Sequence, residues 1–155
     1  MTHQTKIENR KAWHDYFILD KFEAGISLLG CEVKSIREGR VNLKESFVRI
    51  LNNEAVLLNC HITPYSKIQG HVDLDPTRSR KLLLHREQIE KLAAQANQKG
   101  YAIVPLEMYF KKGRVKVQIA VGRGKTAYDK RETIKRKIHD RESAAAVKHH
   151  ANKRR

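Results

Sequence analysis

The chain is poor in the residues that mark metal centres, membrane segments and secreted proteins. Its 155 residues include only two cysteines, Cys31 and Cys60, and their spacing fits neither C-x-x-C nor a zinc-ligand pattern, so we expect free thiols. No apolar run approaches the ~18–20 residues of a membrane-spanning helix. The first ten residues lack the apolar centre of a signal peptide. These absences predict a cytoplasmic protein without a metal site.

Catalytic signatures are also missing. The sequence has no G-x-S-x-G, P-loop or H-E-x-x-H motif and no paired acids in an apolar setting. Two His–Asp neighbours remain, at His14 and His139. We expect the first on a strand, where adjacent side chains point to opposite faces, and the second in a solvated segment. We therefore expect that the protein is not an enzyme and needs no cofactor. The enzymatic alternative is a small nuclease that uses His14 or His139.

What the chain has in excess is positive charge. Lys and Arg total 32 against 17 Asp and Glu, a formal net charge of +15. From Arg123 onward there are 12 basic and 4 acidic residues, so just over half of the excess lies in the last 33 residues. A charge this large and this uneven favours a polyanionic partner, and we predict nucleic acid.

The hydrophobic pattern predicts a mainly β protein with inserted helices. Asn9 is a candidate cap for a short helix, Gly39 a stop for the next one, and Asn52-Asn53 and Lys112-Gly113 are candidate hairpin turns. In the strand after Lys112-Gly113, we expect Val115, Val117, Ile119 and Val121 to lie on one face. We expect two strands within 14–30 joined by a turn at 23–25, hairpins within 45–62 and 101–122, helices at 10–12, 31–39 and 82–100, and a long loop over 63–80.

About six short antiparallel strands in so small a chain are most economically closed into an OB-type barrel, which removes exposed edges. A helix-flanked open sheet is the alternative. We expect residues 1–122 to form this barrel domain and residues 123–155 to form a basic C-terminal tail.

Three basic segments of the barrel domain are candidates for RNA contact. They mix cations with Asn, Ser or Thr, the residue types that contact phosphate and sugar. Their candidate residues are Asn9, Arg10, Lys11, Lys34, Arg37, Arg78, Arg80 and Lys81. From the residues alone, Glu23 is most simply a turn residue and Leu83 most simply part of the core.

The tail begins "GRGKTAYDKRE", in which Gly122 and Gly124 are expected to loosen the junction with the last strand. Its apolar face is too narrow to dock firmly, so we predict a segment that is disordered alone and becomes helical against RNA. Tyr128, flanked by cations, is a candidate for stacking on an unpaired base, worth ~1–3 kcal/mol.

Six segments, in order from about Asn9 to Glu132, resemble the SsrA-binding proteins (small protein B), the bacterial partners of transfer-messenger RNA. They are "NRKAWHDYFI", "FEAGISLLGCEVKSIREGR", "HITPY", "RSRKLLLH", "KGYAIVPLEMYFKKGRVKVQIAVGRGK" and "YDKRE". The resemblance implies an OB-type barrel with added helices. It also implies binding of the tRNA-like part of transfer-messenger RNA and its delivery, with elongation factor Tu, to stalled ribosomes for trans-translation.

The same resemblance implies roles for single residues. Asn9, Glu23 and Leu83 would belong to the RNA-binding face, against the simpler interpretations of Glu23 and Leu83 given above. In the tail, the residues that would serve the decoding site and messenger channel of the ribosome are Gly124, Lys125, Asp129, Lys130 and Arg131. Some members have histidine where this chain has Tyr128. Tyrosine keeps a planar ring for stacking but, unlike histidine, does not change its charge near neutral pH. Ala146-Val147 replace a bulkier apolar pair, which predicts a weaker contact in the far tail.

The predicted function is therefore a monomeric RNA-binding adaptor of ribosome rescue, with no membrane association. A ribosomal or rRNA-associated OB-fold structural protein is the alternative.

Overall fold

The computed structural model describes residues 5–65 and 74–153, with side chains as far as His149. These residues form two compact units, one ending at Gly124 and the other starting at Lys125. Residues 66–73 of the predicted loop over 63–80 lie outside the described residues.

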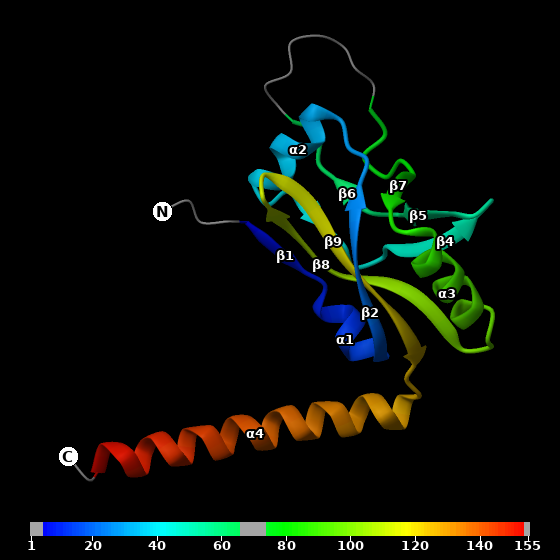
Figure 1. The fold of residues 1–155 in the computed structure, drawn as a ribbon. Coiled ribbons are helices and arrows are strands. Elements are labelled where there is room, and N and C mark those ends of the chain that lie inside the picture. The colour runs from blue at the N-terminus through cyan, green and yellow to red at the C-terminus, as the bar shows by residue number, and fades with distance from the viewer. Residues whose placement is uncertain (1–4, 66–73, 154–155) are drawn as a thin grey trace. The chain divides into compact units, whose positions relative to one another are not determined.

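Nine strands and four helices occur in the described part of the chain, drawn in Figure 1. The strands are β1 (Lys6–Glu8), β2 (Tyr16–Ile26), β3 (Val41–Asn42), β4 (Phe47–Leu51), β5 (Glu54–Leu58), β6 (His61–Ile62), β7 (Arg80–Leu83), β8 (Tyr101–Lys111) and β9 (Arg114–Gly124). The helices are α1 (Arg10–Asp15), α2 (Gly30–Arg37), α3 (Arg86–Ala96) and α4 (Ala127–Lys153).

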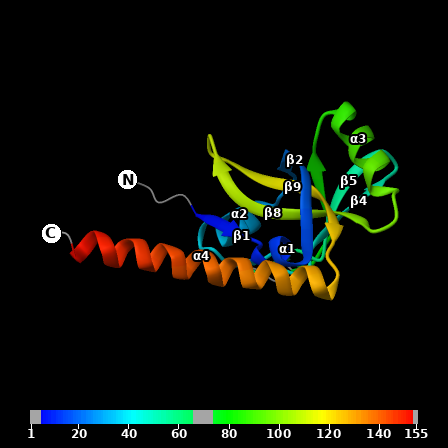
Figure 2. The ribbon, with the colours of Figure 1, turned by 90° about the horizontal axis from the view of Figure 1, so that it is seen from below.

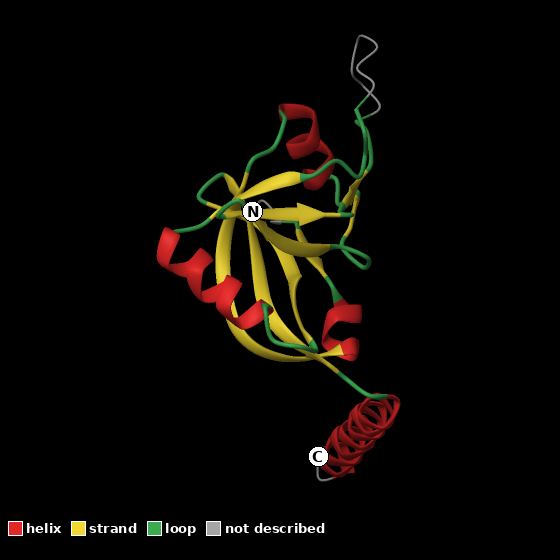
Figure 3. Cartoon of the chain, turned by 90° about the vertical axis from the view of Figure 1, so that its right-hand side faces the viewer, coloured by secondary structure: helices red, strands yellow, loops and turns green. Residues whose placement is uncertain are grey.

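Six antiparallel strands form a ring in the order β8-β4-β5-β7-β2-β9, and β9 pairs back with β8. In Figure 3 the strands curve around a common interior and the short helices lie outside them. The ring is unevenly closed, because β8 and β9 pair along their whole length whereas β4 meets β8 at a single registered pair, Val48 with Ile103. The prediction of a mainly β, OB-type architecture is confirmed, with a ring in place of an evenly closed barrel.

Apolar side chains at every second position of β9 point into the interior of this ring. Val115, Val117, Ile119 and Val121 are all buried, as the period of two predicts. Helices α2 and α3 add Ile36 and Leu92 to the same core cluster. The two long strands β2 and β9 pair with each other and run side by side across the body, which Figure 2 shows from below.

Both predicted hairpin turns are present. Asn52 and Asn53 have φ of 48° and 61°, and Lys112 and Gly113 have φ of 51° and 76°. Asparagine and glycine tolerate this left-handed region better than other residues, and Lys112 adopts it in the second turn beside Gly113. The two turns fix the register of β4 with β5 and of β8 with β9.

The predicted turn at residues 23–25 is wrong. These residues lie inside the single strand β2, where Glu23, Ala24 and Gly25 pair with Gln118, Val117 and Lys116 of β9. Pairing with a long neighbouring strand overrides the local turn signal of Gly25. The irregularity of β2 lies earlier, as a bulge between Ile18 and Lys21.

Gly122 and Gly124 do not loosen the start of the tail, because both are strand residues of β9, and the predicted domain boundary after Gly122 falls inside this strand. A Cβ atom on Gly122 would lie 2.8 Å from Tyr16 Cβ, so this glycine permits close packing of β9 on β2. After Gly124 the chain forms α4, a helix of 27 residues. The predicted disorder of the free tail stays a prediction.

Candidate nucleic-acid interface

Three of the predicted residues, Glu23, Lys81 and Leu83, line one groove of about 970 Å³. They come from two neighbouring strands, β2 and β7, which pair at Gly25 with Leu83. The start of β9 contributes Arg114 and Lys116, and the start of α3 contributes residues such as His85 and Gln88. The groove is therefore lined by both apolar side chains and cations, the combination that accommodates bases and phosphates together.

Leu83 is 54% exposed, so the expectation that it belongs to the core is wrong. The register of β7 explains this, because Leu82 points inward and is 1% exposed, which turns its neighbour outward. Gly25 lies opposite Leu83, where an added Cβ would meet Leu83 Cβ at 3.2 Å. The leucine thus presents an apolar surface to the groove.

Glu23 also faces this groove from the middle of β2. Its carboxylate accepts a hydrogen bond from the Tyr109 hydroxyl and lies 3.3 Å from Lys111 Nζ. The hydrogen bond from Tyr109, followed by the contacts with Lys111, lowers the pKa of Glu23. Burial, together with the Glu23 carboxylate, raises the pKa of Tyr109, so the pair is an anionic acceptor held by a neutral phenol at neutral pH.

Tyr109, Lys111 and Lys116 were missed by the sequence analysis. The hairpin register contained the signal, because Lys116 lies directly opposite Tyr109 in the predicted β8–β9 hairpin. Since Val115 and Val117 point inward, alternation places Lys116 on the outer face with Glu23's partner, Gln118.

Lys34 and Arg37 lie on the exposed face of α2. Each contacts an aromatic ring, with Lys34 Nζ 5.5 Å from the centre of Tyr65 and Arg37 Cζ 5.6 Å from that of Phe110. These contacts hold the cationic ends in place while leaving them at the surface. Val33 of the same helix lines the groove, so α2 borders it.

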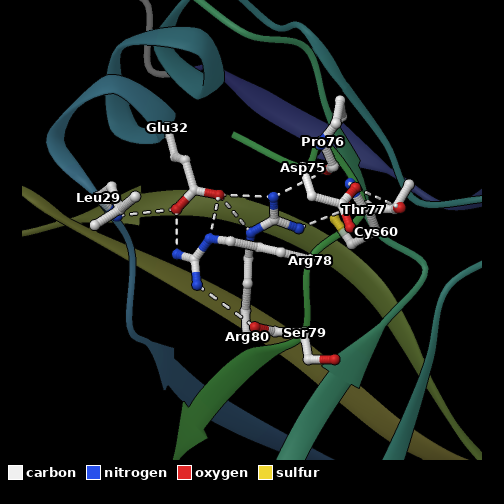
Figure 4. A network of polar contacts seen from close by, with 9 residues as sticks. All are labelled: Leu29, Glu32, Cys60, Asp75, Pro76, Thr77, Arg78, Ser79 and Arg80. Carbon is white, nitrogen blue, oxygen red and sulfur yellow. Dashed lines mark hydrogen bonds and ion pairs between the residues drawn. The ribbon is translucent and has the colours of Figure 1, made fainter. Parts of the chain in front are cut away.

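Arg80 does not lie at the surface, which corrects the expectation that it contacts RNA directly. Its side chain is 0% exposed and donates to Glu32 Oε2 at 2.7 Å, to the Cys60 carbonyl at 2.7 Å and to the Pro76 carbonyl at 3.0 Å (Figure 4). A buried guanidinium needs these partners to offset its lost hydration. In the segment "RSRK", Arg80 forms a structural ion pair and does not contact a ligand at the surface. Only its burial distinguishes these two roles.

Arg78 shares the same carboxylate but stays partly exposed. Its Nε donates to Glu32 Oε2 at 3.1 Å, one Nη donates to Oε1, and the side chain is 29% exposed. Burial disfavours ionisation of Glu32, yet hydrogen bonds from Arg78, the Leu29 amide and Arg80 outweigh it and lower the pKa of this carboxyl. The network ties α2 to the chain entering β7 (Figure 4).

Asn9 is 2% exposed and caps α1, as predicted from its position. Its Oδ1 accepts from the Ala12 amide at 3.3 Å, and its Nδ2 donates to the carbonyls of Pro105 and Leu43 at 2.8 and 3.2 Å. These bonds occupy the side-chain amide, so Asn9 supports its neighbours and does not itself face the solvent.

The next two residues are the exposed cations of this region. The Arg10 side chain is 93% exposed, and Lys11 Nζ pairs with Glu45 at 2.5 Å. The hydrogen bond that Lys11 donates to the Glu45 carboxylate raises the pKa of Lys11. Asn9 and Lys11 line a second groove of about 850 Å³ between α1, β4, α3 and β8, separate from the groove at Leu83.

The tail residues Lys125, Tyr128, Asp129, Lys130 and Arg131 span the start of α4. Tyr128 is 69% exposed, as stacking on a base requires. Gly124 belongs to the body and donates its amide to the Gly100 carbonyl at 3.0 Å. Farther along, Ile134, Ile138 and Val147 are between 45% and 70% exposed, so these apolar side chains of α4 form no buried core.

His14 and Asp15 do interact, contrary to the expectation for neighbours on a strand. They end α1, where the His14 Nδ1 and Asp15 Oδ1 atoms lie 2.9 Å apart. In the described part of the chain no three His, Cys, Asp or Glu residues gather as a metal site requires. Among the described helices none is long and apolar enough to cross a membrane.

Comparison with known proteins shows which family the chain resembles. The family model described as SmpB protein matches residues 6–149. An SsrA-binding protein of Shouchella clausii is 56% identical over 91% of this chain and 90% of its own length. One of Caldanaerobacter subterraneus subsp. tengcongensis is 54% identical over 87% of this chain and 85% of its own.

Among solved structures, one described as "tmRNA-SmpB: a journey to the center of the bacterial ribosome" contains a similar chain. The two superpose with a TM-score of 0.69 at 44% identity, covering 84% of this chain and 94% of the other. With a family model that spans most of its length and relatives more than half identical, this chain belongs to the SmpB family of SsrA-binding proteins.

Proposed function

We propose that this protein binds the tRNA-like part of transfer-messenger RNA and brings it to stalled ribosomes for trans-translation. The observation that carries the proposal is the groove at Leu83, which an exposed leucine, an anionic acceptor and several cations line together. Family membership supports it, since the relatives are named SsrA-binding proteins and the similar structure includes transfer-messenger RNA and the ribosome. The protein acts without catalysis, in the cytoplasm and together with elongation factor Tu.

Within the groove, the cations and Glu23 have different tasks. Lys81, Arg114 and Lys116 neutralise phosphates, which supplies affinity that falls with salt. A carboxylate repels phosphates, so Glu23 accepts hydrogen bonds from base or ribose donors. Leu83 covers the apolar face of a base or sugar.

The second unit has a later task. Residues Lys125–Arg131 serve the decoding site and α4 follows the messenger channel, where ribosomal RNA supplies the counter-charge for a helix with little apolar surface. Tyr128 stacks on an unpaired base.

A truncation after Gly124, the last residue of β9, tests this division. The shortened protein should bind transfer-messenger RNA almost as tightly as the full chain in filter-binding titrations, and ordinary tRNA more weakly. It should fail to support peptide tagging in a reconstituted translation system with stalled ribosomes. Tagging by the truncated protein, or co-purification with ribosomal subunits at equal amounts without transfer-messenger RNA, would contradict the proposal.

A further inference from the structure

Helix α4 has no apolar docking face among its described side chains, which end at His149, so its first turn depends on local hydrogen bonds. Ile134 and Ile138 are about half exposed, and the helix carries 8 basic and 4 acidic residues. An isolated helix pays for nucleation before it gains from propagation. The residues that begin α4 therefore have a large influence on whether it forms.

Those residues make a reciprocal capping arrangement. Asp129 Oδ2 accepts from the Thr126 amide at 3.2 Å and from the Thr126 hydroxyl at 2.9 Å. In return, the Asp129 amide donates to Thr126 Oγ1 at 3.2 Å. The Thr126 carbonyl accepts the first helical bond, from the Lys130 amide at 3.0 Å, which identifies Thr126 as the N-cap.

A second set of bonds closes the following turn. Lys125 Nζ donates to Thr133 Oγ1, and Thr133 Oγ1 donates to the Asp129 carbonyl, both at 3.0 Å. Asp129 also places a negative charge in the first turn, where the positive end of the helix dipole favours it. All these bonds lie within the second unit of the chain.

We infer that Asp129 is a positioning residue that, with Thr126, caps α4 and sets where the tail helix begins. In the proposed function, on which this inference rests, the resemblance assigns Asp129 to the ribosome together with Lys130 and Arg131. The hydrogen bonds give Asp129 a role different from that of Lys130 and Arg131, because its carboxylate accepts from Thr126 at the start of its own helix. Lys130 and Arg131 then follow at fixed positions in the first turn, with the orientation that the cap imposes.

Four substitutions in the full-length chain test this inference. Thr126→Ala and Asp129→Ala each remove one side of the cap, which weakens formation of the first turn by about fivefold. Thr126→Ser keeps the hydroxyl, and Asp129→Glu keeps the carboxylate in the residue type that capping boxes favour. Ellipticity at 222 nm, in water and along a trifluoroethanol titration, should show less helix for both alanine variants and wild-type behaviour for the other two.

Peptide tagging on stalled ribosomes should follow the same pairing. Thr126→Ala should lose tagging to the same extent as Asp129→Ala, while Thr126→Ser and Asp129→Glu retain it, and filter binding of transfer-messenger RNA should be unchanged in all four. Full tagging by Thr126→Ala, failure of Asp129→Glu, or helix formation unaffected by either alanine would overturn the inference. Failure of the wild-type chain to tag would instead contradict the proposed function, while the ellipticity comparison would still decide the cap.

Discussion

Two adjacent leucines of β7, Leu82 and Leu83, point to opposite sides of the strand and have different roles. Leu82 is 1% exposed in the core and Leu83 is 54% exposed in the groove. Both are leucines, so composition and hydropathy are identical and only the strand register distinguishes them.

Substitution to alanine should separate these two leucines. Leu82→Ala should lower the free energy of unfolding by about 2–5 kcal/mol, because it leaves a cavity in a packed core. Leu83→Ala should leave stability nearly unchanged and weaken transfer-messenger RNA binding about tenfold, as loss of ~1.4 kcal/mol of apolar contact requires. Urea unfolding and filter binding measure the two effects, and equal loss of stability in both variants would contradict the assignment.

Glu32 should give the body a pH-dependent stability. Its pKa is lowered in the folded state, so the folded protein binds fewer protons than the unfolded chain as the pH falls. The stabilisation is therefore complete above the unfolded pKa of about 4.3. It is lost as the pH falls through the lower folded pKa.

Glu32→Gln should remove this dependence and leave two guanidiniums without their shared carboxylate. We expect a loss of about 3–5 kcal/mol at pH 7, since the Arg80 side chain is fully buried. Urea unfolding between pH 7 and pH 3 measures it. Glu90→Gln, which removes an exposed pair with Arg86, is the control and should change little.

At the scale of the element, the end of β9 depends on one close approach. Gly122 lies against Tyr16 of β2, where an added Cβ would have to displace Tyr16 Cβ at 2.8 Å. An added Cβ on Gly124, two residues on, would meet only the Gly100 carbonyl oxygen, at 3.9 Å. Of the two glycines of "GRG", only Gly122 is thus required by close packing.

Gly122→Ala should lower the free energy of unfolding by about 1–3 kcal/mol through overpacking. Gly124→Ala should be nearly neutral, and it is the matched control. Thermal unfolding followed by tryptophan fluorescence would measure both, since Trp13 is the only tryptophan of the sequence and lies in α1 close to Tyr16 in the chain. Equal stability of the two variants would contradict the packing argument.

At the scale of the whole molecule, positive charge is divided between a folded body and a helical tail. The body places Lys34 and Arg37 at the surface of α2, the helix that contributes Val33 to the groove. If RNA capture belongs to the body, the salt dependence of binding should depend on these cations and not on α4.

The double substitution Lys34→Ala, Arg37→Ala should reduce the slope of log K against log salt by about 1–2 for transfer-messenger RNA. Replacing Lys148, which is exposed on α4, should leave the slope unchanged. Filter binding between 50 and 200 mM salt, roughly the range over which phosphate contacts dominate, measures it. A larger change of this slope from the Lys148 substitution than from the double substitution would contradict the assignment of RNA capture to the body.

Much of the architecture could be predicted from local patterns. The Asn9 cap, the Asn52-Asn53 and Lys112-Gly113 turns and the apolar alternation of β9 depend on neighbours in the sequence, so these predictions were confirmed. The resemblance over six ordered segments likewise indicated the family that the comparisons establish.

The sequence by itself determined the charge, the strand and helix pattern, the turns and the family. The tertiary structure decided which of the similar residues face the solvent: that Arg80 is buried while Arg78 is partly exposed, that Leu83 lines a groove, and that Glu23 sits mid-strand beside Tyr109. The physical reason is that burial and long-range pairing arise from segments far apart in the chain, as Glu32 meets Arg80 and Glu23 meets Tyr109. No local pattern contains the partner that fixes what a charged or apolar side chain does.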